Sequence, residues 1–405
     1  MAEEMEGRQL TRGQRLWYRL IEIRQNAPIS LERAKLLTAS WRETEGLPVC
    51  LRRAKAFEKV VTEIPIYIED EELLCGHYGS WPMVAEWHPE LGVEWVLERF
   101  ESELGSLKIR SEDIPLMKEI AQYWKDKAAD ACYFRYIGNE EEQRIRMLDY
   151  HGTLIRHLYQ ECCRGQGWCV PDYAKAIRKG LLGILAEVQE EIQTTPVRDE
   201  ASRDKRFFLE ALTIVIRAGI RYARRHAELA RELARGAQGQ RKAELEQMAE
   251  ICEWVPANPA RTFWEALQTL WFCHLMMFFD YLENGVSPGR VDQYLYPYYK
   301  RDIEQGRLTR EQALELLELL RCHYSCYRLL AEASLQEKGS GEANWFNCVL
   351  GGLTPDGQDA TNELSYLWLE AAERVRSPHP TLSIRVHENT PEELSLIHIS
   401  EPTRL

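Results

Sequence analysis

The segment ENGVSPGRVDQYLYPYY, residues 283–299, decides the fold more than any other part of the chain. It brings a glycine, a serine, a Pro-Gly pair, an arginine and an aspartate close together, and four tyrosines follow. A Pro-Gly pair favours a turn because proline presets φ and glycine accepts positive φ. The segment therefore predicts a loop that presents polar side chains from a rigid aromatic base.

The composition of the whole chain is that of a globular protein. The 405 residues are 45% hydrophobic and 28% charged, which supports one large domain, or two closely packed ones, around a real core. The formal charge of -13 opposes phosphate backbones, and lysine and arginine are not clustered. Nucleic-acid binding is therefore not expected.

The sequence carries no membrane or export signal that we recognise. It lacks an uncharged apolar run of about 18 residues, the length needed to cross a bilayer. The acidic N-terminal residues include no apolar region of the kind found in signal peptides. We expect a cytoplasmic protein whose eleven cysteines are thiols in a reducing compartment.

Helical periodicity is clearest in the middle of the chain. Residues Arg206–Ala234 show an apolar face at three- and four-residue steps, and Arg261–Phe279 is apolar nearly all round, which predicts an internal helix. A third helix is expected to begin at Thr309, with Gln312 completing a capping box.

Beyond these helices the pattern changes to a strand, a helix and a strand. Trp345–Leu350 and Leu382–Val386 are short apolar or alternating runs, and an amphipathic helix is predicted between them over Thr361–Val375. Such a βαβ unit predicts parallel strands with a right-handed crossover and helices on both faces of the sheet.

The final residues behave differently from the rest. Thr390, Pro391 and Glu393 form the start signal of a helix, yet SLIHISEPTRL (395–405) does not continue it. We expect a domain over residues 1–394 and a non-native tail over 395–405. A natural frayed terminus is the alternative.

Several blocks of sequence, taken together, resemble the glycyl radical enzymes, the pyruvate formate-lyase-like family. Besides SPGRVDQYLYPYY, they are GWCVPDYAKAIRKGLLGI (167–184), TFWEALQTLWFCHL (262–275), GGLTPDGQDATNELS (351–365) and PTLSIRVH (380–387). The blocks occur in family order, and the resemblance covers residues 15–394. This corresponds to the N-terminal half of a family member.

The resemblance implies an α/β fold, namely the helix-rich N-terminal part of a ten-stranded α/β barrel, here a truncated half-barrel. It also implies an anaerobic lyase whose glycyl radical is installed by an activating enzyme that uses S-adenosylmethionine and an iron–sulfur cluster. No cofactor is expected to bind this chain directly. The partners implied are a small-molecule substrate, the activating enzyme and a second subunit in a homodimer.

The family's reactive residues are not found in this sequence. None of the eleven cysteines lies in a Gly-Cys-x-Glu setting, and the glycine motif that carries the radical is also missing. The resemblance places that cysteine just beyond Leu394. We therefore expect no catalytic residue in this chain and an inactive fragment.

Four residues are candidates for substrate binding. Trp168 occupies the position that lines the active site in relatives, where an indole suits an apolar or aromatic substrate, although it can also simply pack against the barrel. The resemblance makes Ser287 a hydrogen-bond donor to substrate and Asp292 a substrate contact. Arg290 is a candidate to grip a carboxylate, and bracing of its own loop is the alternative.

A metal site is not expected from the sequence. His157, Cys162, Cys163 and Cys169 offer the right ligand types, but adjacent cysteines followed by a gap do not match the usual C-x2-C geometry.

Three hypotheses about function remain open at this stage. The first is a lyase acting on a small organic acid or alcohol, similar to the arylacetate decarboxylases or to the dehydratases. The second is an enzyme similar to the alkyl- and benzylsuccinate synthases, which add a hydrocarbon to fumarate. The third is a non-catalytic helical scaffold.

Overall fold

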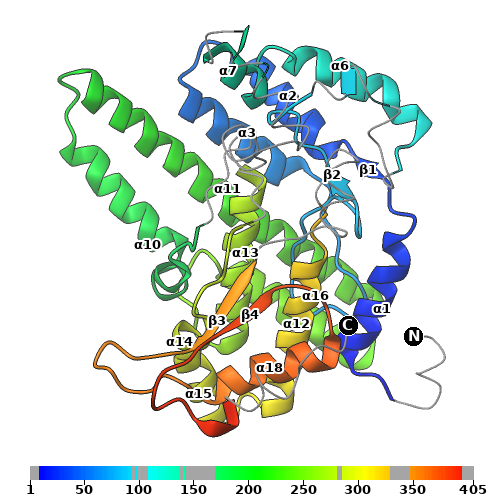
Figure 1. The fold of residues 1–405 in the computed structure, drawn as a ribbon, viewed down its shortest axis with the longest axis vertical. Coiled ribbons are helices and arrows are strands. Elements are labelled where there is room, and N and C mark those ends of the chain that lie inside the picture. Colours follow the sequence, from blue (N-terminus) through cyan, green and yellow to red (C-terminus); the bar gives the residue numbers. More distant parts are fainter. Residues whose placement is uncertain are drawn as a thin grey trace.

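The computed structural model describes residues 9–93, 96–97, 100, 108–136, 140–141, 144, 169–280, 285–328 and 346–394. Helices predominate, and the strands are few and short (Figure 1). The helices are α1 (Arg12–Arg24), α2 (Glu32–Glu43), α3 (Val49–Glu63), the 3-10 turn η2 (Ser111–Asp113), α6 (Ile114–Trp124), α7 (Ala129–Tyr136), α10 (Tyr173–Thr194), α11 (Glu200–Gly236), α12 (Gly239–Trp254), α13 (Phe263–Asp280), α14 (Val291–Tyr294), α15 (Tyr296–Glu304), α16 (Arg310–Ser325) and α18 (Glu363–Val375). The strands are β1 (Ile29–Ser30), β2 (Ala85–Glu86), β3 (Asn347–Gly351) and β4 (Thr381–Arg385).

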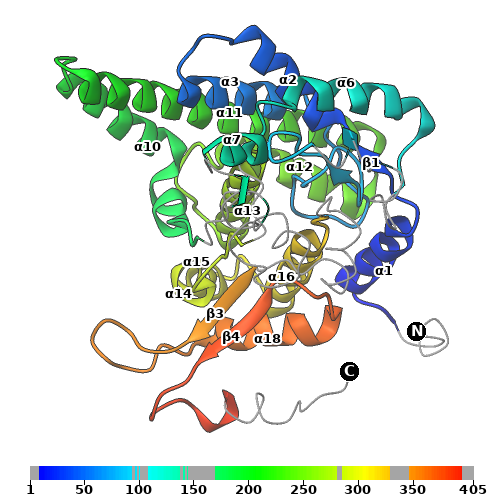
Figure 2. The same cartoon turned by 45° about the horizontal axis from the view of Figure 1, so that its top comes forward.

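A parallel strand pair near the end of the chain confirms the βαβ unit. β3 and β4 pair in parallel with Cys348 opposite Leu382, and α18 connects them along the chain. α18 begins at Asn362, whose side chain forms a capping box with Ser365, and it packs against α16 (Figure 2). The expected strands are therefore present, displaced by about one residue.

Two further segments extend this pair as isolated parallel bridges. Gly289 pairs with Cys348 of β3, and Val286 pairs with Cys169. The resulting order across the ladder is Cys169, then residues 286–289, then β3 and β4. The strands are parallel and helices pack against them, which is the α/β class that the sequence predicts.

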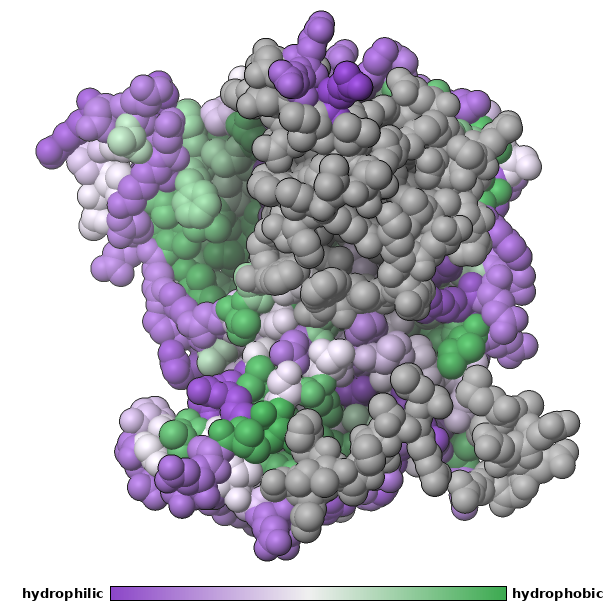
Figure 3. Space-filling model, viewed as in Figure 1, coloured by the Kyte–Doolittle hydropathy of each residue, from purple (hydrophilic) through white to green (hydrophobic). Residues whose placement is uncertain are grey.

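α10 and α11 form an arm that projects from the body (upper left in Figure 1). α11 runs for 37 residues, and its first turn is closed by a capping box between Asp199 and Ser202. Leu185 of α10 and Ile216 of α11 belong to one small apolar cluster between the two helices. The same part of the molecule shows apolar surface in Figure 3. The expected helix over Arg206–Ala234 is confirmed and is longer than predicted.

Gly180 interrupts α10 in its first half. Its φ of 67° lies in the left-handed region that favours glycine. The break allows the Leu181 N–H to donate to the Pro256 carbonyl at 2.7 Å. A Cβ at position 180 would lie 2.5 Å from the Ala257 carbonyl oxygen, so only glycine fits there without movement of the backbone.

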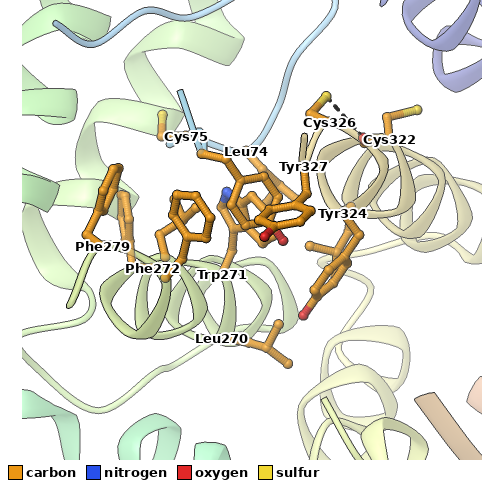
Figure 4. Close-up of a cluster of buried hydrophobic side chains, with 14 of the residues drawn as sticks. Leu74, Cys75, Leu270, Trp271, Phe272, Phe279, Cys322, Tyr324, Cys326 and Tyr327 are labelled. Atoms are coloured by element: carbon orange, nitrogen blue, oxygen red, sulfur yellow. Dashed lines mark hydrogen bonds between the residues drawn. The ribbon is translucent and has the colours of Figure 1, made fainter. Parts of the chain in front are cut away.

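The main core lies between α13, α16 and the irregular segment of residues 64–84. α13 is buried on almost every side, as its sequence predicts, and α16 begins with the expected Thr309–Gln312 capping box. Trp271 of α13 meets Tyr324 of α16 edge to face, with ring centroids 5.1 Å apart, whereas Phe272 lies on the Phe279 side of this core (Figure 4).

α13 holds the irregular segment through side chains that bind its backbone. Gln268 makes two hydrogen bonds of 2.8 Å with the backbone of Cys75, one to the N–H and one to the carbonyl. The Trp271 indole donates to the Gly76 carbonyl at 2.7 Å. A chain without its own ladder hydrogen bonds is thereby satisfied in the interior.

α1 is joined to the far end of the sequence. The Thr11 hydroxyl donates to Glu318 of α16 at 2.7 Å, and the Gln14 amide donates to the Arg374 carbonyl of α18 at 2.8 Å. Gly13 of α1 lies so close to α16 that a Cβ at this position would be 2.6 Å from the Glu318 Cβ.

Among the described helices, none has both the length and the apolar character required to cross a bilayer.

Candidate functional site

The segment that decides the fold lies as an extended strip beside β3. The Ser287 N–H donates to the Cys169 carbonyl at 2.9 Å, and the Val349 N–H donates to the Gly289 carbonyl at 2.8 Å. Gly289 has a φ of +70°, and a Cβ there would meet Val170 at 2.6 Å. This glycine lets the chain leave the strip and enter α14. Glu283 and its neighbours at 281–284 lie outside the described residues.

The tyrosines that follow the strip pack as the expected aromatic base. Tyr299 is fully buried and meets Phe263 edge to face, with ring centroids 5.7 Å apart. The Tyr294 hydroxyl donates to the Pro288 carbonyl at 2.9 Å. The base therefore holds the strip through both packing and a hydrogen bond.

Arg290 binds backbone carbonyl groups at the end of β3 and in the loop that follows it. Its guanidinium donates to the Gly351 carbonyl at 2.7 Å and to the Leu353 carbonyl at 3.1 Å. These are the contacts expected if the arginine braces its loop. Its binding to a substrate carboxylate stays a prediction.

Asp292 is fully buried and joins three elements. Its Oδ2 accepts hydrogen bonds from the Gly351 N–H at 2.7 Å and from the Ser365 hydroxyl at 2.6 Å, and its carbonyl accepts from the Asn362 amide. Burial raises the pKa of Asp292, while the hydrogen bonds from Ser365 and Gly351 act in the opposite direction. Its Oδ1 has no partner within the described part of the chain. Contact of Asp292 with substrate stays a prediction.

Ser287 differs from Arg290 and Asp292 because it begins a row of polar side chains across neighbouring strands. Its Oγ accepts a hydrogen bond from the Asn347 N–H at 3.1 Å. The Asn347 side-chain amide lies 3.0 Å from the Ser383 hydroxyl, and Thr381 extends the row. Ser287 and Asn347 are half-buried, whereas Ser383 and Thr381 are exposed. We call these four residues the polar row.

The polar row can bind hydroxyl groups and oxyanions through neutral hydrogen bonds, because each member can donate. The sequence identified only Ser287 among the four. Asn347 and Ser383 were missed because their proximity depends on the pairing register, in which Val349 lies opposite Ser383 and Asn347 opposite Thr381. Alternation along the two predicted strands was the one available signal.

Trp168 lies outside the described residues, as do His157, Cys162 and Cys163. Cys169, the next residue, is half-buried and pairs with Val286 at the edge of the strip.

The buried cysteines and the half-buried Cys273 form no disulfide, and the surroundings of Cys273 and Cys348 do not favour a thiolate. Burial raises the pKa of Cys273 to about 12 and raises that of Cys348 on β3 as well. These groups are therefore thiols near neutral pH, whereas a reactive cysteine requires a thiolate or a strong hydrogen-atom acceptor nearby. The expected absence of a catalytic residue from this chain stays a prediction.

Ligands for a metal ion occur together at a second place, in the core beside the irregular segment. Glu72, His77 and His323 are all buried, and their potential ligand atoms lie within 4.8 Å of one another. Burial raises the pKa of Glu72 to about 7 and lowers that of His77 to about 3. Sequence spacing could not reveal this cluster, because His323 is far from the other two along the chain.

Comparison with known proteins places most of the chain in one group. The pyruvate formate lyase-like family model matches residues 12–399. The isethionate sulfite-lyase of Oleidesulfovibrio alaskensis is 39% identical over 383 residues, which make up 90% of this chain and 45% of that protein.

Solved structures agree in fold as well as in sequence. A structure concerned with 1,2-propanediol dehydration in Roseburia inulinivorans has a TM-score of 0.89 and 32% identity, covering 96% of this chain and 46% of its own. A glycyl radical enzyme from Archaeoglobus fulgidus has a TM-score of 0.87 and 33% identity, with 96% and 50% coverage. The chain thus spans about half the length of the relatives it matches. The α/β class expected from the sequence is confirmed.

Proposed function

Because this chain belongs to the pyruvate formate lyase-like family, whose members include glycyl radical enzymes, we propose that it forms part of a radical lyase. Its substrate is a small hydroxylated organic compound that loses a leaving group such as sulfite or water. The isethionate sulfite-lyase and the structure concerned with 1,2-propanediol dehydration support this class, since each is named for such an elimination.

The observation that carries the proposal is the polar row. Ser287, Asn347 and Ser383 present two hydroxyl groups and one amide across adjacent strands. Such groups suit a substrate rich in hydroxyl or sulfonate oxygens, because each oxygen can then be matched with a hydrogen bond. An arylacetate would instead require a broad apolar surface, so the polar row favours elimination over decarboxylation of an aromatic acid.

Each candidate residue has a separate role in this proposal. Ser287 binds the substrate and orients it. Arg290 and Asp292 are positioning residues, since both bind the backbone of Gly351 at the end of β3 and keep the strip in place. Trp168 is proposed to line the same site.

The radical chemistry requires groups beyond these residues. We propose a domain over residues 1–394 that receives its reactive cysteine and radical glycine from sequence outside that range. The glycyl radical supplies hydrogen-atom abstraction once an activating enzyme with S-adenosylmethionine and an iron–sulfur cluster has installed it. We further propose that the enzyme acts under anaerobic conditions, because a radical of this kind demands exclusion of oxygen. We propose a cytoplasmic homodimer from the family resemblance alone.

The test is an anaerobic assay of the whole protein after activation. Isethionate, 1,2-propanediol and indoleacetate are offered separately, and released sulfite, aldehyde or methylated arene is measured. We expect turnover of a hydroxylated compound and none of indoleacetate. Turnover of indoleacetate alone would overturn the proposal.

Replacement of the serine tests the polar row itself. Ser287→Ala should lower kcat/KM roughly tenfold, the effect of losing one hydrogen bond to the substrate. Ser111→Ala, which changes an exposed serine in η2, is the control and should leave kcat/KM unchanged. Equal rates for the wild-type protein and Ser287→Ala would remove the serine from substrate binding.

The lack of a recognisable radical-glycine motif in this sequence predicts a spectroscopic result. The 405-residue chain alone, incubated anaerobically with an activating enzyme and S-adenosylmethionine, should show no glycyl radical signal by electron paramagnetic resonance. A known family member treated in the same way is the positive control. A signal from the isolated chain would mean that a radical-bearing glycine lies within residues 1–405.

A further inference from the structure

Three titratable side chains lie together in the core, on the side of α13 and α16 that faces the irregular segment. Glu72 and His77 come from that segment, and His323 comes from the last turn of α16. Their exposed fractions are 1%, 4% and 1% respectively. They share no hydrogen bond with the polar row among the described residues. The proposed lyase activity does not use them.

Both imidazole rings turn the same nitrogen toward a single carboxylate. His77 Nε2 lies 3.0 Å from Glu72 Oε2, and His323 Nε2 lies 3.8 Å from Glu72 Oε1. The first distance is that of a hydrogen bond, and the second is too long for one. The carboxylate therefore stands between two imidazoles and satisfies only one of them.

The cluster has more binding capacity than partners. Within the described ranges, Nδ1 of His77 and both ring nitrogens of His323 are buried and make no hydrogen bond of normal geometry, although the Gly76 backbone lies near the His323 ring. A buried polar atom left without a partner is destabilising, because it has lost its hydration without gaining a hydrogen bond. Buried groups of this kind require an explanation such as a bound ion or a water molecule.

From this geometry we propose that Glu72, His77 and His323 bind one divalent transition-metal ion of borderline softness, of which Zn²⁺ is the representative. Two imidazole nitrogens and one carboxylate oxygen are a ligand set that such ions prefer. The set leaves one or more coordination positions for water. Calcium and magnesium do not fit, because they require oxygen ligands.

Small side-chain movements would complete the site. With bonds of about 2.0–2.2 Å, ligand atoms around one ion are roughly 3–3.5 Å apart, so His323 must approach by roughly 1 Å. The two imidazole rings are stacked with planes 21° apart, so this approach includes a rotation of one ring toward the carboxylate. Tyr67 stacks on His77, and Trp271 packs edge-on against His323, which limits other movements.

The bound ion would fasten the irregular segment to α16. α13 already holds this segment through Gln268 and Trp271, which bind Cys75 and Gly76. An ion on Glu72, His77 and His323 would hold it through α16 as well and close a loop of the chain between residues 77 and 323. Closing a long loop stabilises the folded state, and an ion that binds only the folded state adds to this stability.

The first test measures metal content and coordination. The chain is freed of metal with a chelator, loaded with Zn²⁺ or Co²⁺, passed through a desalting column and analysed for bound metal. One ion per chain is expected, with a Co²⁺ visible spectrum free of the sulfur-to-cobalt band that cysteine ligands produce. Absence of stoichiometric binding, or a spectrum dominated by cysteine, would overturn the proposal.

Variants assign the ligands. Glu72→Gln, His77→Gln and His323→Gln should each weaken Zn²⁺ binding about tenfold or more, since loss of even an outer partner costs that much. The control is His274→Gln, a buried histidine whose two ring nitrogens already bind the hydroxyl groups of Tyr78 and Tyr173. Unchanged affinity in the cluster variants, or an equal loss in the control, would contradict the assignment.

A variant that gains a spectroscopic band, rather than losing metal binding, separates a ligand role from a failure to fold. His323→Cys should introduce the sulfur-to-cobalt band into the Co²⁺ spectrum, because a thiolate would then replace an imidazole. In the wild-type chain Zn²⁺ should also raise Tm, and at the same Zn²⁺ concentration it should raise the Tm of His323→Gln by less. A folded His323→Cys chain that binds Co²⁺ without that band would show that the ion lies elsewhere.

Discussion

At the scale of single residues, buried histidines determine how this chain responds to acid. His226 is fully buried in α11, and its Nδ1 lies 2.9 Å from the Tyr222 carbonyl. The Tyr222 and Phe272 rings surround it. His226 thus lies on the buried, apolar face of α11 as a core histidine. Burial lowers the pKa of His226 from 6.5 to about 3, because the charged form cannot be hydrated there.

The direction of this shift predicts acid sensitivity. The unfolded chain binds a proton at His226 below its ordinary pKa of 6.5, whereas the folded chain binds one only near 3. The contribution of neutral His226 to the free energy of unfolding is therefore fully present above pH 6.5. It is lost as the pH falls from 6.5 toward about 3, by about 1.4 kcal/mol per pH unit. His226→Gln should remove this part of the slope, measured by urea unfolding at several pH values between about pH 6 and pH 4. Above about pH 7.5 the two proteins should show parallel stability curves, and identical acid slopes would contradict the prediction.

At the scale of elements, sequence reasoning worked where the signal was local. The Thr309–Gln312 capping box and the helix of residues 361–375 could be predicted because a cap and its helix are neighbours along the chain. The polar row could not be predicted, because it depends on register between strands. The break at Gly180 was also missed, since the reason for it is the Pro256–Ala257 backbone, far along the sequence.

That break gives a prediction with a matched control in the same helix. Gly180→Ala should lower the free energy of unfolding by roughly 1–3 kcal/mol, because alanine is strained at positive φ and its Cβ would meet the Ala257 carbonyl. Gly183→Ala should be neutral or stabilising by up to about 1 kcal/mol, since alanine is the better helix former and the neighbour at 3.3 Å is the Lys179 side chain. Denaturant unfolding checks both, and equal losses would contradict the strain at position 180.

At the scale of the whole molecule, β4 is the feature that governs solution behaviour. Among the described strands β4 pairs only with β3, so its other edge has no strand partner there. Its side chains are exposed or half-buried, and Val386 beyond it is 63% exposed. Unpaired strand edges with apolar neighbours promote association between chains.

The isolated chain is therefore expected to self-associate, and charge at this edge should reduce the effect. Val386→Lys should shift the sedimentation profile toward monomer, because a lysine at a strand edge opposes pairing with a second chain. Val197→Lys, at a site 57% exposed between α10 and α11, carries the same charge change elsewhere and should not. A wild-type chain that is monomeric and melts in one sharp transition would contradict this expectation.

The attachment of α1 to α16 and α18 has a consequence for synthesis. Thr11 and Gln14 find partners 307 and 360 positions later, so α1 leaves the ribosome long before the helices that it packs against. At 5–20 residues per second this delay lasts roughly 15–70 s. Throughout that time Leu16, Trp17 and Leu20, which the finished protein buries, remain available to chaperones. The yield of native protein is thus tied to the pace of translation and to the chaperone supply of the host.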